Sequence, residues 1–187
     1  MSKYLTASTR AEYERMIAEG YDVSKGSTRP IVPDAISVAD QLGLWREGTV
    51  NLDLGGGKYA LGTNYLAERG VVNLILDPGN RPPWHNLEVL DYIEQHGCHT
   101  ATLANLLNVI PTEEGKAFAV RTAYDALYPG GMMFVCTHAA KERGWNPRSK
   151  SWQEGPRPLH TYLPLVSPPF IVYGGRPTRG IIIALKP

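Results

Sequence analysis

The feature that most constrains this chain is a run of three glycines placed directly after a short apolar segment. Residues 50–66 read VNLDLGGGKYALGTNYL, in which the apolar segment carries one acid, Asp53, and then breaks at Gly55, Gly56 and Gly57. Glycine allows a tight turn and a close approach of the backbone to a ligand, and a helix that begins there offers free N–H groups. The segment therefore predicts a buried strand, a turn and a helix start that bind a nucleotide-like ligand.

Apolar runs and helix-like patterns alternate along the following part of the chain. The apolar runs cover residues 71–77, 100–107 and 132–136, and the helix-like patterns cover residues 85–96 and 112–127. Two later apolar runs, 170–173 and 180–185, are separated by GGRPTR and predict a C-terminal antiparallel hairpin. We therefore expect an α/β fold: a Rossmann-like, doubly wound, mainly parallel sheet with helices on both faces.

Two helices are predicted ahead of the first strand. Residues 9–12 fit a capping box for a helix that ends at Gly20, and Pro33-Asp34 opens a second helix. The two helices either form a flap over the ligand site or cover the sheet, and the sequence leaves both alternatives open. We expect a single domain that comprises a helical cap over 1–46, a binding core over 48–187 and a substrate-side loop over 139–165.

Composition excludes several classes of protein. Nineteen basic and eighteen acidic side chains among 187 residues nearly cancel, so no global field favours nucleic acid or a membrane. The two cysteines, Cys98 and Cys136, lie far apart and indicate no disulfide framework. No apolar run reaches the roughly 18 residues of a membrane span, and the first residues lack the apolar core of a secretory signal. A cytoplasmic protein is expected.

Two kinds of nucleotide-binding turn compete at the glycines. A P-loop is excluded, because Lys58 is followed by Tyr59 rather than by Ser or Thr. A dinucleotide fingerprint is satisfied by Gly55, Gly57 and Ala60, and Asp77 lies where a ribose-binding acid belongs. A nicotinamide oxidoreductase therefore stays open, although the chain has no second substrate domain and no Tyr-x-x-x-Lys pair.

Several motifs in order resemble another family. Asp53-x-Gly55-x-Gly57 ends the first strand, Asp77 closes the second, Pro-Gly-Gly follows the long helix, and a hairpin ends the chain. Over residues 48–187 this arrangement resembles the class I methyltransferases that depend on S-adenosylmethionine. The resemblance implies that Asp53 receives the methionine amino group, directly or through water, and that Gly55 and Gly57 lie against methionine and ribose. It also implies that Asp77 accepts hydrogen bonds from both ribose hydroxyls, which suits an acceptor-only carboxylate.

The chain departs from the family pattern at three places. Tyr59 stands where a third glycine is common. Only one apolar run separates Asp77 from the long helix, where two strands are usual, so the loss of one edge strand stays open together with the side chain that holds the adenine amine. The motif of Asn or Asp, Pro-Pro and an aromatic residue is absent, and residues 103–108 read LANLLN.

The motifs and the resemblance together give the residues that we expect to bind the cofactor and to take part in catalysis. The expected S-adenosylmethionine ligands are Asp53, Gly55, Gly56, Gly57, Tyr59, Asp77, Pro78, Ala104 and Asn105. Asn105, Asn108 and His138 are the catalytic candidates, since the two amides follow a central strand and a histidine is a general base near neutral pH. Two alternatives stay open: Asn108 caps the following turn, or His138 is an ordinary exposed loop histidine.

Candidate substrate contacts lie in two loops. Arg81 and His85 belong to the segment DPGNRPPWHN, whose alternative role is that of a stiff loop with a helix cap. Trp145 and Trp152 lie in the basic loop 141–157, which either contacts a phosphate-bearing substrate or is an ordinary solvated loop. The segment His96-Gly97-Cys98-His99 has no partner cluster at zinc-site spacing, so no metal is expected.

The sequence thus predicts an S-adenosylmethionine-dependent methyltransferase that aligns its acceptor for in-line attack on the sulfonium methyl. A small-molecule acceptor is favoured by the compact size, and nucleic acid stays open through the basic loop. The alternatives are a protein that binds S-adenosylmethionine without transferring its methyl group and, third, an NAD-dependent oxidoreductase. The oligomeric state is not predicted.

Overall fold

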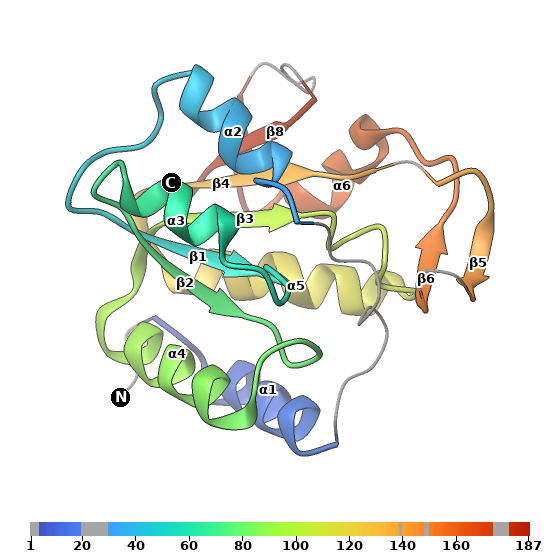
Figure 1. Ribbon diagram of the computed structural model, residues 1–187, viewed down its shortest axis with the longest axis horizontal. Coiled ribbons are helices and arrows are strands. Elements are labelled where there is room, and N and C mark those ends of the chain that lie inside the picture. The colour runs from blue at the N-terminus through green and yellow to red at the C-terminus, as the bar shows by residue number, and fades with distance from the viewer. Residues whose placement is uncertain (1–3, 20–29, 139, 148–149, 174–179) are drawn as a thin grey trace.

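The computed structural model describes residues 4–19, 30–138, 140–147, 150–173 and 180–187, and a six-stranded sheet forms its centre (Figure 1). The strands of this sheet are β1 (Val50–Leu54), β2 (Val72–Leu76), β3 (Cys98–Ala104), β4 (Leu127–Cys136), β7 (Ile171–Val172) and β8 (Ile182–Leu185). Their order is β2-β1-β3-β4-β8-β7. Strands β2, β1, β3 and β4 are parallel to one another, β8 is antiparallel to β4, and β7 is antiparallel to β8. The predicted fold class and the predicted C-terminal hairpin are confirmed.

Helices cover both faces of this sheet. They are α1 (Ala7–Glu19), α2 (Asp34–Gln41), α3 (Leu61–Ala67), α4 (Pro83–His96), α5 (Glu113–Ala126) and α6 (Leu163–Val166), with a short 3-10 helix, η1 (Leu159–Tyr162). The alternation along β4 shows the two faces: Met133 and Val135 belong to the core under α4 and α5, whereas Phe134 and Cys136 pack against α2. A strand buried on both faces reads as a continuous apolar run, which explains why these strands could be predicted.

The two N-terminal helices separate onto opposite faces. Arg10 of α1 pairs with Asp91 and Glu94 of α4, at 2.7 and 2.6 Å. Ala35 and Ala39 of α2 are fully buried on the other side of the sheet, in the cluster that contains Phe134. Figure 1 shows α1 below α4 at one side of the molecule and α2 at the other. Each of the two helices therefore covers its own face of the sheet.

Several predicted boundaries shift. Helix α1 begins one turn before the predicted capping box, because Thr6 caps it by accepting the Thr9 N–H at 3.1 Å. Strand β4 begins at Leu127 and includes the Pro-Gly-Gly segment that was predicted to lie between helix and strand. This segment is held by the C-terminal end of the chain, since Gly130 N–H donates to the Lys186 carbonyl and Lys186 N–H donates to the Gly131 carbonyl, both at 2.9 Å.

A second hairpin was missed by the sequence analysis. The segment predicted to be irregular forms β5 (Arg143–Asn146) and β6 (Ser151–Glu154), a separate two-stranded sheet with Trp145 directly opposite Trp152. Its strands are short and polar, so period-two patterning gave no signal, whereas aromatic residues paired across strands stabilise a hairpin. It projects beyond the carboxyl ends of β3 and β4 (Figure 1). The GGRPTR connection between β7 and β8 lies outside the described residues.

Strand β2 lies at the edge of the sheet, where the sequence left open the loss of one strand. Strand β2 pairs with β1, and within the described residues no strand lies on its other side. Helix α4 alone connects β2 to β3 across the sheet, so the strand that the family usually has between them is absent from the described chain.

Among the described residues, no helix is long and apolar enough to cross a membrane.

Candidate functional site

The carboxyl ends of β1, β3 and β4 open into a cavity of about 790 Å³. The chain leaves β1 through α3 to reach β2, and then returns across the sheet through α4 to β3. The strand order therefore reverses between β1 and β3, which is the switch point where open α/β sheets bind ligands. Nine of the expected site residues line the cavity: Asp53, Gly55, Gly56, Tyr59, Ala104, Asn105, Asn108, His138 and Trp145.

Asp53 is the buried acid of this cavity. Its side chain is at the end of β1 with 2% of the residue exposed, and Thr102 Oγ1 donates to its Oδ1 at 2.8 Å. Burial raises the pKa of Asp53 to about 6, although the hydrogen bonds from Thr102 and Asn73 act in the opposite direction. Both of these side-chain partners are neutral, so within the described part of the chain the carboxylate has no cation bonded to it, and Arg81 acts on it only through its more distant charge.

The glycine turn is shaped around this carboxylate. A Cβ atom on Gly56 would lie 2.5 Å from Asp53 Oδ2, which leaves no space for a side chain. Gly55 and Gly57 adopt φ angles of 69° and 72°, in the region that favours glycine. The triplet therefore keeps the backbone close to Asp53 and open to the cavity.

A hydrogen-bonded network of neutral polar side chains extends from Asp53 into the sheet. Asn51 Nδ2 donates to Asn73 Oδ1 at 2.7 Å and to Thr102 Oγ1 at 3.1 Å. Thr100 Oγ1 donates to Asn51 Oδ1 at 2.9 Å, and Asn73 Nδ2 donates to Thr63 Oγ1 of α3 at 3.1 Å. Because β1, β2 and β3 each contribute members, the network fixes the position of Asp53 relative to three strands. Its members were not predicted, since alternate residues in apolar strands carry no local signal of hydrogen bonding.

Asp77 organises the loop that follows β2. Its Oδ2 accepts the Gly57 N–H at 2.8 Å, and its Oδ1 accepts the N–H groups of Gly79 at 3.1 Å and Asn80 at 3.0 Å. The Asn80 side chain also donates to both carboxylate oxygens, at 3.2 and 3.1 Å. A carboxylate offers about four acceptor sites, so this one is filled by its own loop. The expected ribose contact requires the Asn80 side chain to turn away.

Arg81 and His85 have partners away from the cavity. Arg81 Nε donates to the Gly57 carbonyl at 2.8 Å and thus ties the glycine turn to the loop after β2. His85 Nε2 lies 3.0 Å from the carbonyl oxygen of Ile75 in β2. Asn86, in the same segment, accepts the Asp77 N–H at 2.8 Å through its side chain. The segment is therefore a stiff, internally bonded loop, and neither Arg81 nor His85 lines the larger cavity.

A second cavity of about 480 Å³ lies on the other side of Leu106. Its walls come mainly from α1, from α5 and from the loop after β2, including Tyr13, Phe118 and Pro78. Gly55 and Leu106 line both cavities, and Leu106 Cδ1 lies 2.7 Å from where a Cβ of Gly55 would stand. The two cavities therefore meet over the first glycine of the turn, with the Leu106 side chain between them.

The loop after β3 presents Asn105 and Asn108, and the loop after β4 presents His138. Asn105 adopts a φ of 56°, which asparagine tolerates, and its N–H donates to the Cys136 carbonyl at 2.9 Å. Asn108 is 5% exposed, and its Oδ1 accepts no hydrogen bond, so it does not cap the following turn. His138 is exposed at the cavity wall.

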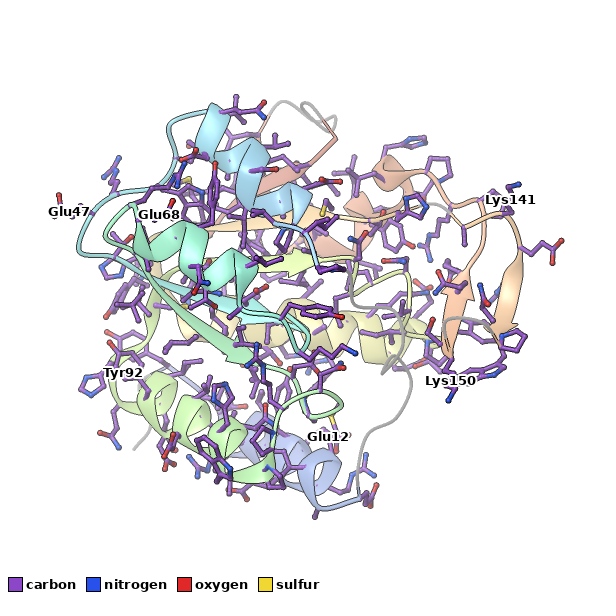
Figure 2. All side chains as sticks on the ribbon, in the orientation of Figure 1. Glu12, Glu47, Glu68, Tyr92, Lys141 and Lys150 are labelled. Carbon is purple, nitrogen blue, oxygen red and sulfur yellow. The ribbon has the colours of Figure 1, made fainter. Side chains whose placement is uncertain are left out.

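The β5–β6 hairpin forms the outer wall. Trp145 is 57% exposed and lines the cavity, whereas Trp152 does not, and its buried Nε1 has no partner in the described structure. Gln153 and Thr137 also line the wall and were not predicted. Thr137 follows β4 directly and precedes His138, so its place at a strand end was a usable signal. Figure 2 shows Lys141 and Lys150 at the outer margin of the molecule beside this hairpin.

A buried cation anchors the hairpin to α5. Lys116 has a fully buried side chain, and its Nζ lies 2.7 Å from Glu113 and 2.8 Å from Glu154. Arg157 pairs with the same two acids, at 2.8 and 3.3 Å. Hydrogen bonds from Arg157 and then from Lys116 lower the pKa of Glu113. The wall of the cavity is therefore held by ion pairs.

The segment 96–99 uses its polar groups in the fold. Cys98 is buried, its Sγ donates to the Ala126 carbonyl at 3.4 Å, and burial raises the pKa of this thiol to about 12. His99 Nδ1 accepts the Val50 N–H at 3.1 Å. Within the described ranges, no three His, Cys, Asp or Glu side chains gather as metal ligands.

The strand order, the switch point and the glycine turn together define the class of fold. No protein-family model and no curated protein matches this sequence. Solved structures do match, and they show that the fold is that of the class I, Rossmann-like methyltransferases dependent on S-adenosylmethionine.

Three of these structures illustrate the similarity. The 1,6-didemethyltoxoflavin-N1-methyltransferase of Burkholderia thailandensis, solved with 1,6-didemethyltoxoflavin and S-adenosylhomocysteine, is 20% identical, with 96% of this chain and 88% of that chain covered and a TM-score of 0.53. A methyltransferase of Aquifex aeolicus is 15% identical, with 92% and 97% covered and a TM-score of 0.53. The pyocyanin biosynthetic protein PhzM is 17% identical, with 82% and 54% covered and a TM-score of 0.56, so this chain spans about half its length.

The residues around the two cavities fit S-adenosylmethionine, subject to one rearrangement. Asp53 offers a buried carboxylate without a bonded cation, which suits a ligand that carries an ammonium group. The two cavities meet over Gly55, so an elongated ligand can place a polar end in one and a flat, apolar end in the other. The rearrangement is at Asp77, where the Asn80 side chain occupies the oxygens that ribose hydroxyls would use.

Proposed function

We propose that this protein is a methyltransferase that uses S-adenosylmethionine to methylate a small molecule. The observation that carries the proposal is Asp53: it is 2% exposed, lines the cavity at the switch point and, among the described residues, takes its side-chain hydrogen bonds from the neutral Thr102 and Asn73. Burying a carboxylate without a cation is costly, and a positively charged ligand removes that cost. The fold and the glycine turn support S-adenosylmethionine as this ligand.

The chain offers a definite set of groups to the cofactor. Asp53 would receive the ammonium group, and Gly55, with Gly56 and Gly57 behind it, would leave the backbone open for close contact. Ala104 and Asn105 lie across the switch point from this turn and would border the methionine end, as would Tyr59. Asp77 and Pro78 line the second cavity, where they would meet the nucleoside end. When bound, S-adenosylmethionine supplies a methyl group on a positively charged sulfur.

The remaining residues would hold and prepare the acceptor. Alignment of the attacking atom with the donor is the main contribution of a protein to such a transfer. Asn105 and Asn108 would orient the acceptor, and His138 would take its proton, since it lines the cavity and histidine is a base near neutral pH. The hairpin wall with Trp145 would limit access of water.

A small acceptor is supported over nucleic acid by the distribution of charge. Lys141, Arg143 and Lys150 are all exposed, and Lys141 and Lys150 lie at the margin of the hairpin. Glu142 lies between two of these cations, and the whole chain has a net charge of only +1. Strong nucleic-acid binding usually needs a continuous basic surface. The solved toxoflavin enzyme holds a small molecule, which supports the same class here.

Titration calorimetry tests the cofactor. We expect S-adenosylmethionine and S-adenosylhomocysteine to bind and NAD not to bind. Binding of NAD alone would overturn the proposal in favour of an oxidoreductase, because Gly55, Gly57 and Ala60 also match a dinucleotide turn.

A labelled-methyl assay tests the reaction. With pooled metabolites, RNA and DNA offered separately, we expect label to enter the metabolite pool. Cofactor binding without any transfer would identify a protein that binds S-adenosylmethionine for another purpose. Transfer to nucleic acid would retain the reaction and replace the acceptor.

A further inference from the structure

Two residues that line the larger cavity each have a buried polar atom without a hydrogen-bond partner in the described structure. Among the described residues, four buried side-chain atoms have no hydrogen-bond partner: Asn108 Oδ1, Thr137 Oγ1, Trp152 Nε1 and Tyr162 OH. Asn108 and Thr137 belong to the cavity wall, whereas Trp152 and Tyr162 do not. Buried polar atoms are nearly always paired, so two exceptions in the wall of one cavity indicate groups that bind a ligand.

The backbone of Asn108 is fixed, but its side-chain oxygen Oδ1 has no hydrogen-bond partner in the described structure. The Glu154 N–H at the end of β6 donates to the Asn108 carbonyl at 2.8 Å, and Lys116 holds the Glu154 side chain. A buried amide oxygen without a partner has lost its bonds to water and gained none within the fold, which is unfavourable. An apolar side chain of the same shape would therefore make the folded state more stable than Asn108 does. Packing does not account for an amide at this position, whereas a hydrogen bond to a bound ligand does.

Thr137 lies next to the same place on the adjacent strand. Ala104 and Cys136 are register partners at the ends of β3 and β4, and the Asn105 N–H donates to the Cys136 carbonyl at 2.9 Å. Thr137 is the next residue, so its hydroxyl and the loop of Asn108 both follow the end of this pair. Asn105, which would border the cofactor, precedes Asn108 in the loop after β3 and is bonded through its N–H to Cys136, the neighbour of Thr137.

The two unpartnered groups of this wall are uncharged, and an aromatic side chain lies in the same wall. An amide and a hydroxyl each donate and accept hydrogen bonds and carry no charge. Lys141 and Arg143, the Lys and Arg side chains among the described lining residues, are both exposed. Trp145 adds an aromatic surface that is 57% exposed. Aromatic side chains favour planar ligands through stacking. The wall therefore suits a neutral ring compound rather than a phosphate.

We propose that Asn108 and Thr137 recognise the methyl acceptor, and that this acceptor is a neutral, planar ring compound with a hydroxyl or ring N–H near the methylated atom. This proposal rests on the proposed methyltransferase function. A half turn of the Asn108 amide exchanges its oxygen and nitrogen, so it can meet either a donor or an acceptor on the ring. Both residues thereby become determinants of specificity that bind the substrate.

Matched probe pairs test this recognition. The probes are 7-hydroxycoumarin against coumarin and 2-quinolone against N-methyl-2-quinolone, titrated by ligand-observed NMR with and without S-adenosylhomocysteine. We expect the wild-type protein to bind at least one hydrogen-bonding member about tenfold more tightly than its partner, as one satisfied buried group permits. The variants N108L and T137V should each remove most of that preference and leave affinity for S-adenosylhomocysteine unchanged.

A matched control removes an orphan atom that lies outside the cavity. Tyr162→Phe deletes a buried, unpartnered hydroxyl and should leave the preference intact. N108L should also not lower the melting temperature, because an apolar side chain of similar shape replaces an unpaired amide.

Three outcomes would overturn the inference: no probe binds at millimolar concentration, both members of each pair bind equally, or N108L and T137V keep the preference. Competition by a short oligonucleotide at lower concentration than the ring probes would also overturn it. If S-adenosylhomocysteine does not bind but the preference is present and lost in N108L, the recognition pair stands while the proposed function fails.

Discussion

Two buried carboxylates of this molecule, Asp53 on β1 and Glu154 on β6, differ in what neutralises them. Glu154 receives Lys116 at 2.8 Å and Arg157 at 3.3 Å, and its side chain is 9% exposed. Asp53 is more deeply buried and is held by Thr102 and Asn73, which carry no charge. Glu154 is therefore neutralised by bonded cations, whereas among the described residues Asp53 is hydrogen-bonded by neutral side chains and feels Arg81 only at a distance.

The difference separates a structural site from a binding site. A self-neutralised ion pair gains nothing from a charged ligand, and its removal leaves an unpaired charge behind. An acid held only by dipoles keeps a cost that a cationic ligand relieves. Asp77 is an intermediate case, because its neutral donors include one side chain, Asn80, that can turn away.

The largest effect is expected from Lys116→Met. The change removes a fully buried cation and leaves Glu154 with Arg157 alone, so the free energy of unfolding should fall by about 3 kcal/mol. Urea unfolding measures it. The double variant K116M/E154Q should recover much of the loss. An unchanged midpoint for the single variant would show that the cluster does not stabilise the hairpin.

Asp53→Asn should act in the opposite direction on stability. Because the folded-state pKa of about 6 lies above the ordinary value of 3.8, stability from this group is full below the lower pKa and is lost as pH rises through the higher one. The variant escapes that loss, so near neutral pH it should be more stable than wild type by roughly 1–3 kcal/mol.

Calorimetry completes the test of Asp53. The same variant should bind S-adenosylmethionine at least about tenfold more weakly, since the ammonium group loses its carboxylate. A variant that is less stable than wild type but binds equally well would place Asp53 in the same structural class as Glu154.

The affinity for S-adenosylmethionine should itself depend on pH. An ionised Asp53 binds the ammonium group, so affinity should be full above the pKa of about 6 and decline as pH falls through it. A decline is also expected above about pH 8, where an α-amino group loses its proton. Titrations across this range measure both limbs. In D53N the acid limb should be absent, and its persistence would assign the titration to another group.

The smallest effect is expected at Asn80. Asn80→Ala removes the side chain that occupies both Asp77 oxygens and should strengthen cofactor binding by about fivefold, the equivalent of one hydrogen bond of about 1 kcal/mol. Asp77→Ala should instead weaken binding by more than about tenfold. Weaker binding in N80A would show that Asn80 positions Asp77 and does not compete with the ribose.

Local patterns in the sequence determined the fold. The apolar run ending at Asp53, the glycine triplet and the alternation of strands and helices predict a parallel sheet with a ligand turn, because periodicity and glycine conformation act over a few residues. The same patterns identified Asp53 and Asn105, which the structure brings to one cavity. They could not reveal the β5–β6 hairpin, whose short polar strands carry no period.

Only the tertiary structure decided which polar groups are left without a partner. Lys116 and Glu154 are 38 residues apart in the chain, and Asp53 and Thr102 are 49 apart, yet these contacts determine which acid has a cation. Likewise, Asn108 accepts the Glu154 N–H on its backbone carbonyl, whereas its buried side-chain oxygen has no partner in the described structure. Burial and neutralisation are properties of neighbours in space, and in this chain those neighbours are brought together by the sheet and its crossovers.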